Sequence, residues 1–436
     1  MKSSRIKYFS LKQGVSYLVF IFLLLIAVFT RSFIGLTIYG FRLGELIIGG
    51  CLLLSLILIF SPNINKKINF TERQFIPTFR IIVIYLLFNF FLNYENFNLY
   101  YLKSSSYIWT VGIIFLGASI SYLYKDSKII TFGFFISPIF VYIIQTGNYP
   151  NFVIDIFIKY SDKFEFMKSA DMVAIVIISS LFVKSVGTSD YFNYLYFNFL
   201  VFLFLPITLT TSRGAVLGIL VFWAIESISY INFIKNKKSA LFVMILINVI
   251  IFTFSVFRVS DIDFRNQDDA PITVVTEAID SVSKQKNTQD VFLTFYFSDG
   301  RVMSTDPTTN WRLDIWQDVI EDLISKNKLL TGYGYQEIIP VMTDPSAPGR
   351  LGRDGLNEHV HNYFFTIIAR GGLINLALFI FLHFLILKKL IINIGLSAYS
   401  LIVPSLLIAS LDIVMDGVQF PILYYFFIGY FSQKKY

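Results

Sequence analysis

The run "HNYFFTIIARGGLINLALFIFLHFLIL", residues 361–387, is apolar almost throughout and long enough to cross a bilayer as a helix. Its first half carries Arg370 and the pair Gly371–Gly372, where we expect the helix to break or turn. Two of the three histidines of the chain, His359 and His361, stand at its start. The run therefore predicts a membrane helix with rare ionisable groups at one end.

Comparable runs recur along all 436 residues, of which 55% are hydrophobic and only 15% are charged. Soluble domains carry about 25% charged residues. The sequence therefore predicts an all-α, polytopic integral membrane protein with about 12 transmembrane helices. The expected spans are 15–30, 43–60, 75–92, 105–123, 129–146, 170–187, 193–210, 213–232, 239–257, 361–387, 397–414 and 418–432.

Lysine and arginine collect in every second connection between these runs, which indicates the orientation. The basic connections lie at the N-terminus, at 66–73, 125–128, 184, 235–238 and 388–389, and at the C-terminus. Both termini are therefore expected in the cytoplasm. The N-terminal run lacks a small-residue cleavage site and is expected to stay as the first helix. Most of the lysines flank apolar runs, so the net charge of +7 does not indicate nucleic-acid binding.

Three regions follow along the chain. Residues 1–257 are expected to hold transmembrane helices 1–9, residues 258–360 one long external (periplasmic) loop, and residues 361–436 helices 10–12. Within the loop, "WRLDIWQDVIEDLI" places apolar residues at helical spacing and predicts an amphipathic helix over 311–324. "TGYGY" at 331–335 is typical of a turn.

Arg213, in "TLTTSRGAVLG", lies between two apolar runs at the external end of a predicted span. A charged side chain beside hydrocarbon is costly and is usually paired with another group or has a function. Thr210, Thr211 and Ser212 can cap the following helix, and its positive end together with Arg213 would favour an anion such as a phosphate. The alternative is an arginine that snorkels at the membrane interface.

His359 and His361 have the chemistry to accept a proton from a sugar hydroxyl, since a histidine pKa lies near neutrality. The alternative is a pair of polar residues at an interface. A zinc site would need a third ligand from Asp354 or Glu358, and the spacing matches no common zinc pattern, so no metal is predicted. Loop arginines near this end would bind a diphosphate, unless they are solvated loop charges: Arg301, Arg312, Arg350 and Arg353.

Several classes of protein are disfavoured. The sequence has no P-loop, dinucleotide fingerprint or nucleophile elbow. Intramembrane carboxylates form no chain, which argues against a proton-driven pump. No cytoplasmic segment is large enough to bind a nucleotide sugar, so any sugar donor would be used on the external side.

Several motifs, in this order, resemble the O-antigen ligase and O-antigen (capsular polysaccharide) polymerase superfamily. They are "SRGAVLG" opening a helix, "WRLDIW" and "LLTGYGY" in a long external loop, "HVHNYFFTIIARGGLINLALF" opening the next span, and the closing "DIVMDGVQFPILYYFFIGYF". The resemblance covers residues 205–435 and in the first 200 extends only to the number of helices.

The resemblance implies a metal-independent glycosyltransferase without cofactors, using a glycan on undecaprenyl diphosphate at the external face of the bacterial inner membrane. By position in the motifs, Arg213 would bind the diphosphate and His361 would be the general base, with His359 beside it. Arg312 would assist, although Asn310 and Trp311 replace the usual small residues before it, so Arg301, after Gly300, competes for that role.

Arg370 stands where many family members carry an acidic residue, and it is also a candidate diphosphate ligand. Two activities fit the motifs, with polymerisation of lipid-linked repeat units favoured over ligation of glycan to the lipid A core. A lipid-linked oligosaccharide flippase is the alternative of another class, although a carrier places its site near the bilayer midplane. Membrane lipid and other polysaccharide-assembly proteins are the further expected partners.

Overall fold

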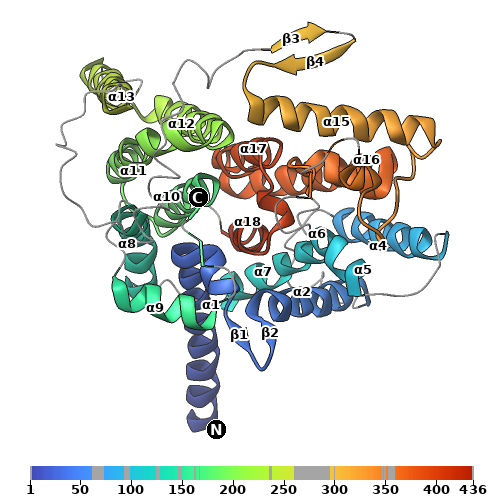
Figure 1. Cartoon of the computed structure of the whole chain (residues 1–436). Coiled ribbons are helices and arrows are strands. Elements are labelled where there is room, and N and C mark those ends of the chain that lie inside the picture. The colour runs from blue at the N-terminus through green and yellow to red at the C-terminus, as the bar shows by residue number, and fades with distance from the viewer. Residues whose placement is uncertain are drawn as a thin grey trace.

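Helices make up most of a computed structural model of the chain, as the apolar runs predict (Figure 1). The structure describes residues 2–60, 73–92, 99–123, 128–145, 150–161, 164–165, 167–234, 238–259, 295–298, 300–345, 347, 350–351 and 359–434. Within these residues the strands form only two short hairpins, β1–β2 (Thr37–Ile38 and Phe41–Arg42) and β3–β4 (Phe295–Ser298 and Arg301–Ser304).

Each of the twelve predicted spans overlaps at least one helix. These helices are α1 (Lys2–Ile34), α2 (Leu43–Phe60), α4 (Phe75–Leu92), α6 (Ser106–Trp109) with η1 (Thr110–Gly112) and α7 (Ile113–Leu123), α8 (Lys128–Gln145), α10 (Ser169–Ser185), α11 (Asp190–Thr211), α12 (Arg213–Ile234), α13 (Lys238–Val259), α16 (Tyr363–Ile394), α17 (Ser397–Ala409) and α18 (Gln419–Phe431).

Five helices of the described chain are long and apolar enough to cross a membrane by length and composition. They contain Gln13–Ile34, Leu43–Phe60, Asp190–Thr211, Arg213–Tyr230 and Tyr363–Ile394. The multi-pass membrane class is thereby confirmed, whereas the count of twelve spans and the orientation stay predictions.

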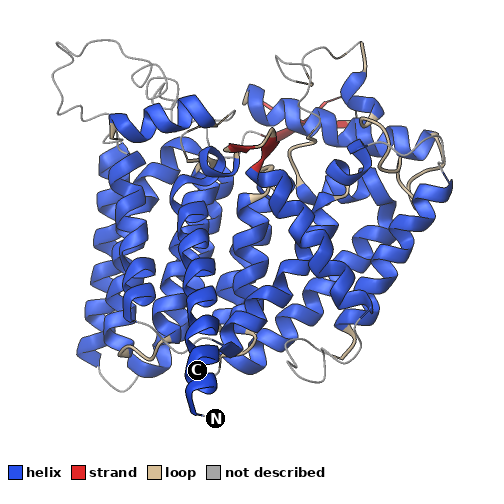
Figure 2. Ribbon diagram, turned by 90° about the horizontal axis from the view of Figure 1, so that it is seen from below, coloured by secondary structure: helices blue, strands red, loops and turns tan. Residues whose placement is uncertain are grey.

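The bundle helices run side by side in Figure 2, and both chain ends lie at one end of the bundle. Helix α9 (Asn151–Tyr160) and helix α15 (Pro307–Ser325) lie across the opposite end (Figures 1 and 2). The sequence placed α9 in an external connection and did not predict it as a helix. We name the end that carries α9 and α15 the lip.

Helix α18 is the centre of the bundle, and all of its residues are buried. It packs closely against α7 through a glycine on each helix. A Cβ on Gly429 would lie 2.0 Å from the Ile114 carbonyl oxygen, and a Cβ on Gly117 would lie 2.0 Å from the Phe426 carbonyl oxygen, so neither position has room for a side chain. In "SRGAVLG" a Cβ on Gly218 would lie 2.5 Å from Ile408. The motif glycines therefore let α12 approach α17.

The amphipathic helix predicted over 311–324 is confirmed as α15, which begins earlier because Asp306 caps it. The Asp306 carboxylate accepts a 2.7 Å hydrogen bond from the backbone N–H of Thr309. Its buried face includes Ile315, Val319 and Leu323, all fully inaccessible. Its Trp316 stacks on Phe365 with ring centroids 5.3 Å apart, which ties α15 to the start of α16.

Helix α16 breaks at Gly372 (φ 70°, ψ −173°), as the glycine pair predicts. The loop before it supplies the missing hydrogen bonds. The N–H groups of Tyr333 and Gly334 donate to the carbonyls of Ala369 (2.7 Å) and Arg370 (3.0 Å), and the Leu373 N–H donates to the Leu329 carbonyl (3.0 Å). The segment "LLTGYGY" is therefore the backbone partner of a broken membrane helix.

Candidate functional site

Arg213 is the first residue of α12 and faces α15. A terminal nitrogen of its guanidinium lies 3.1 Å from the Asp306 carboxylate, and the other donates to the Thr309 hydroxyl. Its side chain keeps 29% exposure.

The cap of α12 is Ser212, whose hydroxyl accepts a 3.4 Å hydrogen bond from the Ala215 N–H. The hydroxyls of Thr210 and Thr211 instead donate to the Ile207 carbonyl. Only one of the three predicted capping residues therefore caps this helix.

Arg312 lies on the same face of α15 and donates a 2.5 Å hydrogen bond to the Leu411 carbonyl beyond α17. Its Nε is buried and has no hydrogen-bond partner in the described part of the chain. Burial lowers the pKa of its guanidinium, and Arg213 lowers it further, while Asp412 and Asp306 raise it. A Cβ on Gly214, the residue after Arg213, would lie 3.0 Å from the Leu411 side chain, so Arg312 and the start of α12 meet at Leu411, as the predicted diphosphate site requires.

His361 lies just before α16 and beside α15. Its ring packs edge-on against Trp311 with centroids 4.9 Å apart, and its Nε2 is buried without a hydrogen-bond partner among the residues that the structure describes. Burial lowers its pKa to about 3, with further lowering by Arg312, His359 and Lys168. His361 is therefore neutral at pH 7. Its backbone has φ 56°, a left-handed conformation that asparagine tolerates better than most residues.

The depressed pKa of His361 predicts an acid-sensitive stability. The unfolded state binds a proton below about pH 6.5 and the folded state only near pH 3, so this contribution is present above pH 6.5 and is lost as the pH falls toward 3. His361→Asn removes the titrating group and keeps the backbone conformation. We expect the free energy of unfolding of the purified protein to fall less between pH 7 and pH 4 in this variant than in wild type. Equal losses in thermal or denaturant unfolding would contradict the assignment.

His359 has a carboxylate partner. Its Nδ1 lies 3.4 Å from Oδ2 of Asp416, which also accepts a 3.2 Å hydrogen bond from the Thr366 hydroxyl. The other oxygen of Asp416 is buried and has no hydrogen-bond partner within the described ranges. A carboxylate at Nδ1 favours the tautomer whose Nε2 is free to accept a proton. Asp416 lies in the closing motif "DIVMDGVQFPILYYFFIGYF", where no local pattern indicates this pairing.

Arg301, the first residue of β4, contacts a different part of α15 from the part that Arg213 contacts. Its guanidinium pairs with Asp318 at 2.6 Å and Asp314 at 3.2 Å, and Arg350 pairs with the same two carboxylates. Arg301 therefore fixes the β3–β4 hairpin to the outer side of α15. Of the two arginines that competed for one role, the structure brings only Arg312 near Arg213. Arg353 lies outside the described residues.

Arg370 is buried within the break of α16. Its guanidinium donates to the carbonyls of Gly334 (3.3 Å) and Glu337 and to the Tyr100 hydroxyl, and it lies 5.4 Å from the centre of the Tyr100 ring. Only 4% of the residue is exposed. The structure does not bring it together with Arg213 and His361, and it connects α16, α5 (Leu99–Ser104) and the loop before α16.

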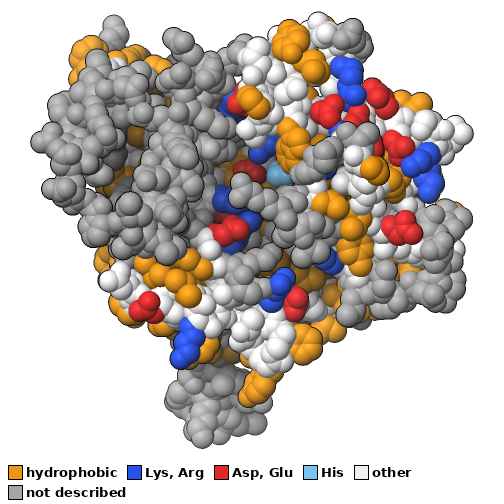
Figure 3. All heavy atoms as spheres, in the orientation of Figure 1, with side chains coloured by type: hydrophobic (Ala, Val, Ile, Leu, Met, Phe, Trp, Pro, Cys, Tyr) orange, Lys and Arg blue, Asp and Glu red, His pale blue; other side chains and the backbone are white. Residues whose placement is uncertain are grey.

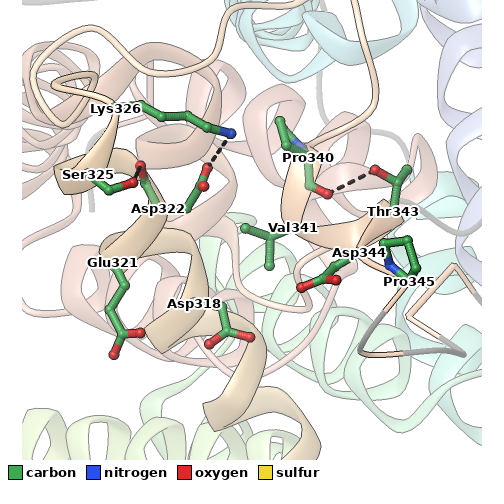
Figure 4. A pocket seen from close by; sticks show the side chains of 10 residues that line it. All are labelled: Asp318, Glu321, Asp322, Ser325, Lys326, Pro340, Val341, Thr343, Asp344 and Pro345. Atoms are coloured by element: carbon green, nitrogen blue, oxygen red, sulfur yellow. Dashed lines mark hydrogen bonds and ion pairs between the residues drawn. The ribbon is translucent and has the colours of Figure 1, made fainter.

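A cavity of about 500 Å³ opens between α15 and η3 (Pro340–Thr343), away from the histidines (Figure 4). Four carboxylates line it, from Asp318, Glu321, Asp322 and Asp344. Its one lysine, Lys326, pairs with Asp322 at 3.0 Å. This lining repels a diphosphate, so the cavity is not the predicted anion site.

The face of the lip shows a histidine near its middle with Lys, Arg, Asp and Glu side chains around it (Figure 3), where Figure 1 has α15, α16 and α17 meeting. Among the described residues no three His, Cys, Asp or Glu side chains are placed to hold a metal ion together. Asp354 and Glu358, the candidate third ligands, lie outside those residues.

One family model, described as O-antigen ligase, matches residues 199–380. The match begins in α11 and ends inside α16, so it contains Arg213, Arg312 and both lip histidines. No curated protein matches the chain. The family match confirms the resemblance seen in the motifs: residues 199–380 are similar to a domain of the O-antigen ligase and polymerase superfamily, whose members are glycosyltransferase-like membrane enzymes.

Proposed function

We propose that this chain is a metal-independent glycosyltransferase that polymerises undecaprenyl-diphosphate-linked repeat units on the external face of the bacterial inner membrane. The observation that carries the proposal is the convergence of Arg213, Arg312 and a neutral His361 at one lip, inside the family-matched region. The product would be O-antigen or capsular polysaccharide. Partners would be the lipid-linked glycan, membrane lipid and other assembly proteins.

The chemistry is a displacement at the anomeric carbon of the donor. The acceptor hydroxyl oxygen forms the new bond to the anomeric carbon. The bond between that carbon and the diphosphate oxygen breaks, and undecaprenyl diphosphate leaves with the electron pair. Arg213 and Arg312 stabilise the negative charge that grows on the leaving group. The hydroxyl proton passes to His361, whose neutral Nε2 has no hydrogen-bond partner in the described residues.

A base with a pKa of about 3 is weak, and its electrostatic neighbours suggest how binding would strengthen it. After burial, the largest cause of the low pKa is the charge of Arg312. A bound diphosphate neutralises that charge, so donor binding raises the pKa of His361 toward its ordinary value. His359, held by Asp416, lies beside it as a second acceptor. Proton transfer is thereby coupled to the presence of donor.

Arg213→Ala is expected to lower glycan transfer by ~100-fold or more, the usual effect of removing one group that stabilises developing negative charge. Arg213 also contacts Thr309, so Thr309→Ala is the matched control for the packing of α12 on α15. We expect that control to keep most activity in a membrane assay with lipid-linked donor. If the two variants lost equal activity at equal protein levels, Arg213 would be a structural contact only.

Ligation of finished glycan to the lipid A core is the second candidate, favoured because the matching family is described as O-antigen ligase. The surface-glycan ladder on a gel separates the two activities. Cells that lack this chain and show core with a single repeat unit and no ladder would support the polymerase. Bare core with long chains left on the carrier lipid would establish the ligase instead. A ladder restored fully by His361→Ala would contradict both and favour a flippase.

A further inference from the structure

The segment just before α10 reaches the candidate site although it lies outside the family-matched region. Ser169, at the start of α10, shares a hydrogen bond with Thr211, two residues before Arg213. Asp171 accepts a 3.4 Å hydrogen bond from the Gln419 amide, close after Asp416. These two contacts fix Lys168, the residue before α10, between the arginine turn and the turn that holds Asp416.

Lys168 is half-buried and has no hydrogen-bond or ion-pair partner among the described residues. Burial lowers the pKa of its ammonium, Arg31 lowers it further, and Asp412, Glu165 and Asp171 raise it without reaching contact distance. The charge of Lys168 also lowers the pKa of His361, so it acts within electrostatic range of that ring. A half-buried ammonium gains from a ligand that supplies negative charge.

Four arginines near the lip are already paired with carboxylates. Arg213 pairs with Asp306, Arg31 with Glu165, and Arg301 and Arg350 with carboxylates of α15. Among the described residues of the lip, Lys168 and Arg312 have no ion pair, and both lie within electrostatic reach of His361. Two unpaired cations beside a neutral base form a site for an anion with more than one charge.

We propose that the ammonium of Lys168 binds the diphosphate of the lipid-linked donor together with Arg312, so that the first half of the chain completes the donor site. The inference rests on the proposed function and adds a binding residue outside the region that the family model matches. Lys168 contacts the leaving group, and it also keeps His361 neutral until the diphosphate arrives.

The test is binding of sugar-free undecaprenyl diphosphate, with undecaprenyl monophosphate for comparison, to the full-length protein in nanodiscs. Lys168→Gln is expected to weaken diphosphate binding about tenfold or more, as for loss of one charge-assisted hydrogen bond, and monophosphate binding less. Lys168→Arg is expected to keep it. Lys159→Ala, at an exposed lysine of α9, is the matched control and is expected to bind like wild type.

A second measurement uses the wild-type protein and does not depend on the folding of a variant. Undecaprenyl diphosphate is expected to protect the Lys168 amine from acylation, read by mass spectrometry, and to leave Lys159 labelled. Two results would overturn this inference alone. The first is unchanged labelling of Lys168 in the presence of undecaprenyl diphosphate. The second is diphosphate binding at the wild-type level by Lys168→Gln while Arg312→Ala binds weakly. Absence of diphosphate binding by the wild-type protein would overturn the inference and the proposed function together.

Discussion

His361→Ala is expected to abolish glycan transfer while leaving the protein folded in the membrane. Among the described residues the side chain has no hydrogen-bond partner at Nε2, and its burial makes a charged form unfavourable. Its removal therefore costs little packing beyond the contact with Trp311. A proton acceptor placed at the reacting hydroxyl contributes about 100- to 10,000-fold to such a reaction. The measurement is the surface-glycan ladder of complemented cells, with the amount of membrane protein determined in parallel.

Two further variants separate the loss of a base from a change in the loop. His361→Asn keeps a residue type that tolerates φ 56° but lacks a basic nitrogen, so it is expected to be as inactive as His361→Ala. His359→Ala removes the neighbour paired with Asp416 and is expected to be milder. If His359→Ala abolished the ladder and His361→Asn restored it, the base would be His359, and the roles of the two histidines would be exchanged.

The helices were predictable because burial in lipid leaves a strong local signal. An apolar run of sufficient length specifies a span, and the helical spacing in "WRLDIWQDVIEDLI" specified α15. The cap at Asp306 was missed because "TDPTTN" reads equally well as a loop, and only the Thr309 N–H shows that it begins a helix. Helix α9 escaped prediction because it is short and lies at the lip, where no long apolar run marks it.

The candidate site was predictable only in part, since partners far apart in sequence leave no local pattern. Arg213, Arg312 and His361 could be singled out as unusual charges beside apolar runs. Nothing near His359 in the sequence indicates Asp416, and nothing near Lys168 indicates that it has no acid partner. The choice between Arg301 and Arg312 likewise depended on which face of α15 each one meets.

Gly372→Ala is expected to cost ~3 kcal/mol or more of stability, because only glycine populates this combination of φ and ψ readily and the site has no room. A Cβ there would lie 2.1 Å from the Leu330 carbonyl oxygen. Relief of that clash would separate α16 from the loop and break the hydrogen bonds at Leu373 and Ile374. The histidine end of α16 would then lose its support, so activity should fall together with the thermal midpoint of unfolding.

Gly395→Ala is the matched control, because it separates backbone strain from collision. Gly395 also has a positive φ of 58°, but a Cβ there meets nothing within 4 Å. We expect it to lower stability by only ~1–2 kcal/mol, the cost of the strained backbone without a clash. Thermal unfolding of both purified variants makes the comparison. Equal thermal midpoints of the two variants would mean that the loop moves to accommodate a side chain at Gly372 without loss of stability. The break in α16 would then not depend on close contact with "LLTGYGY".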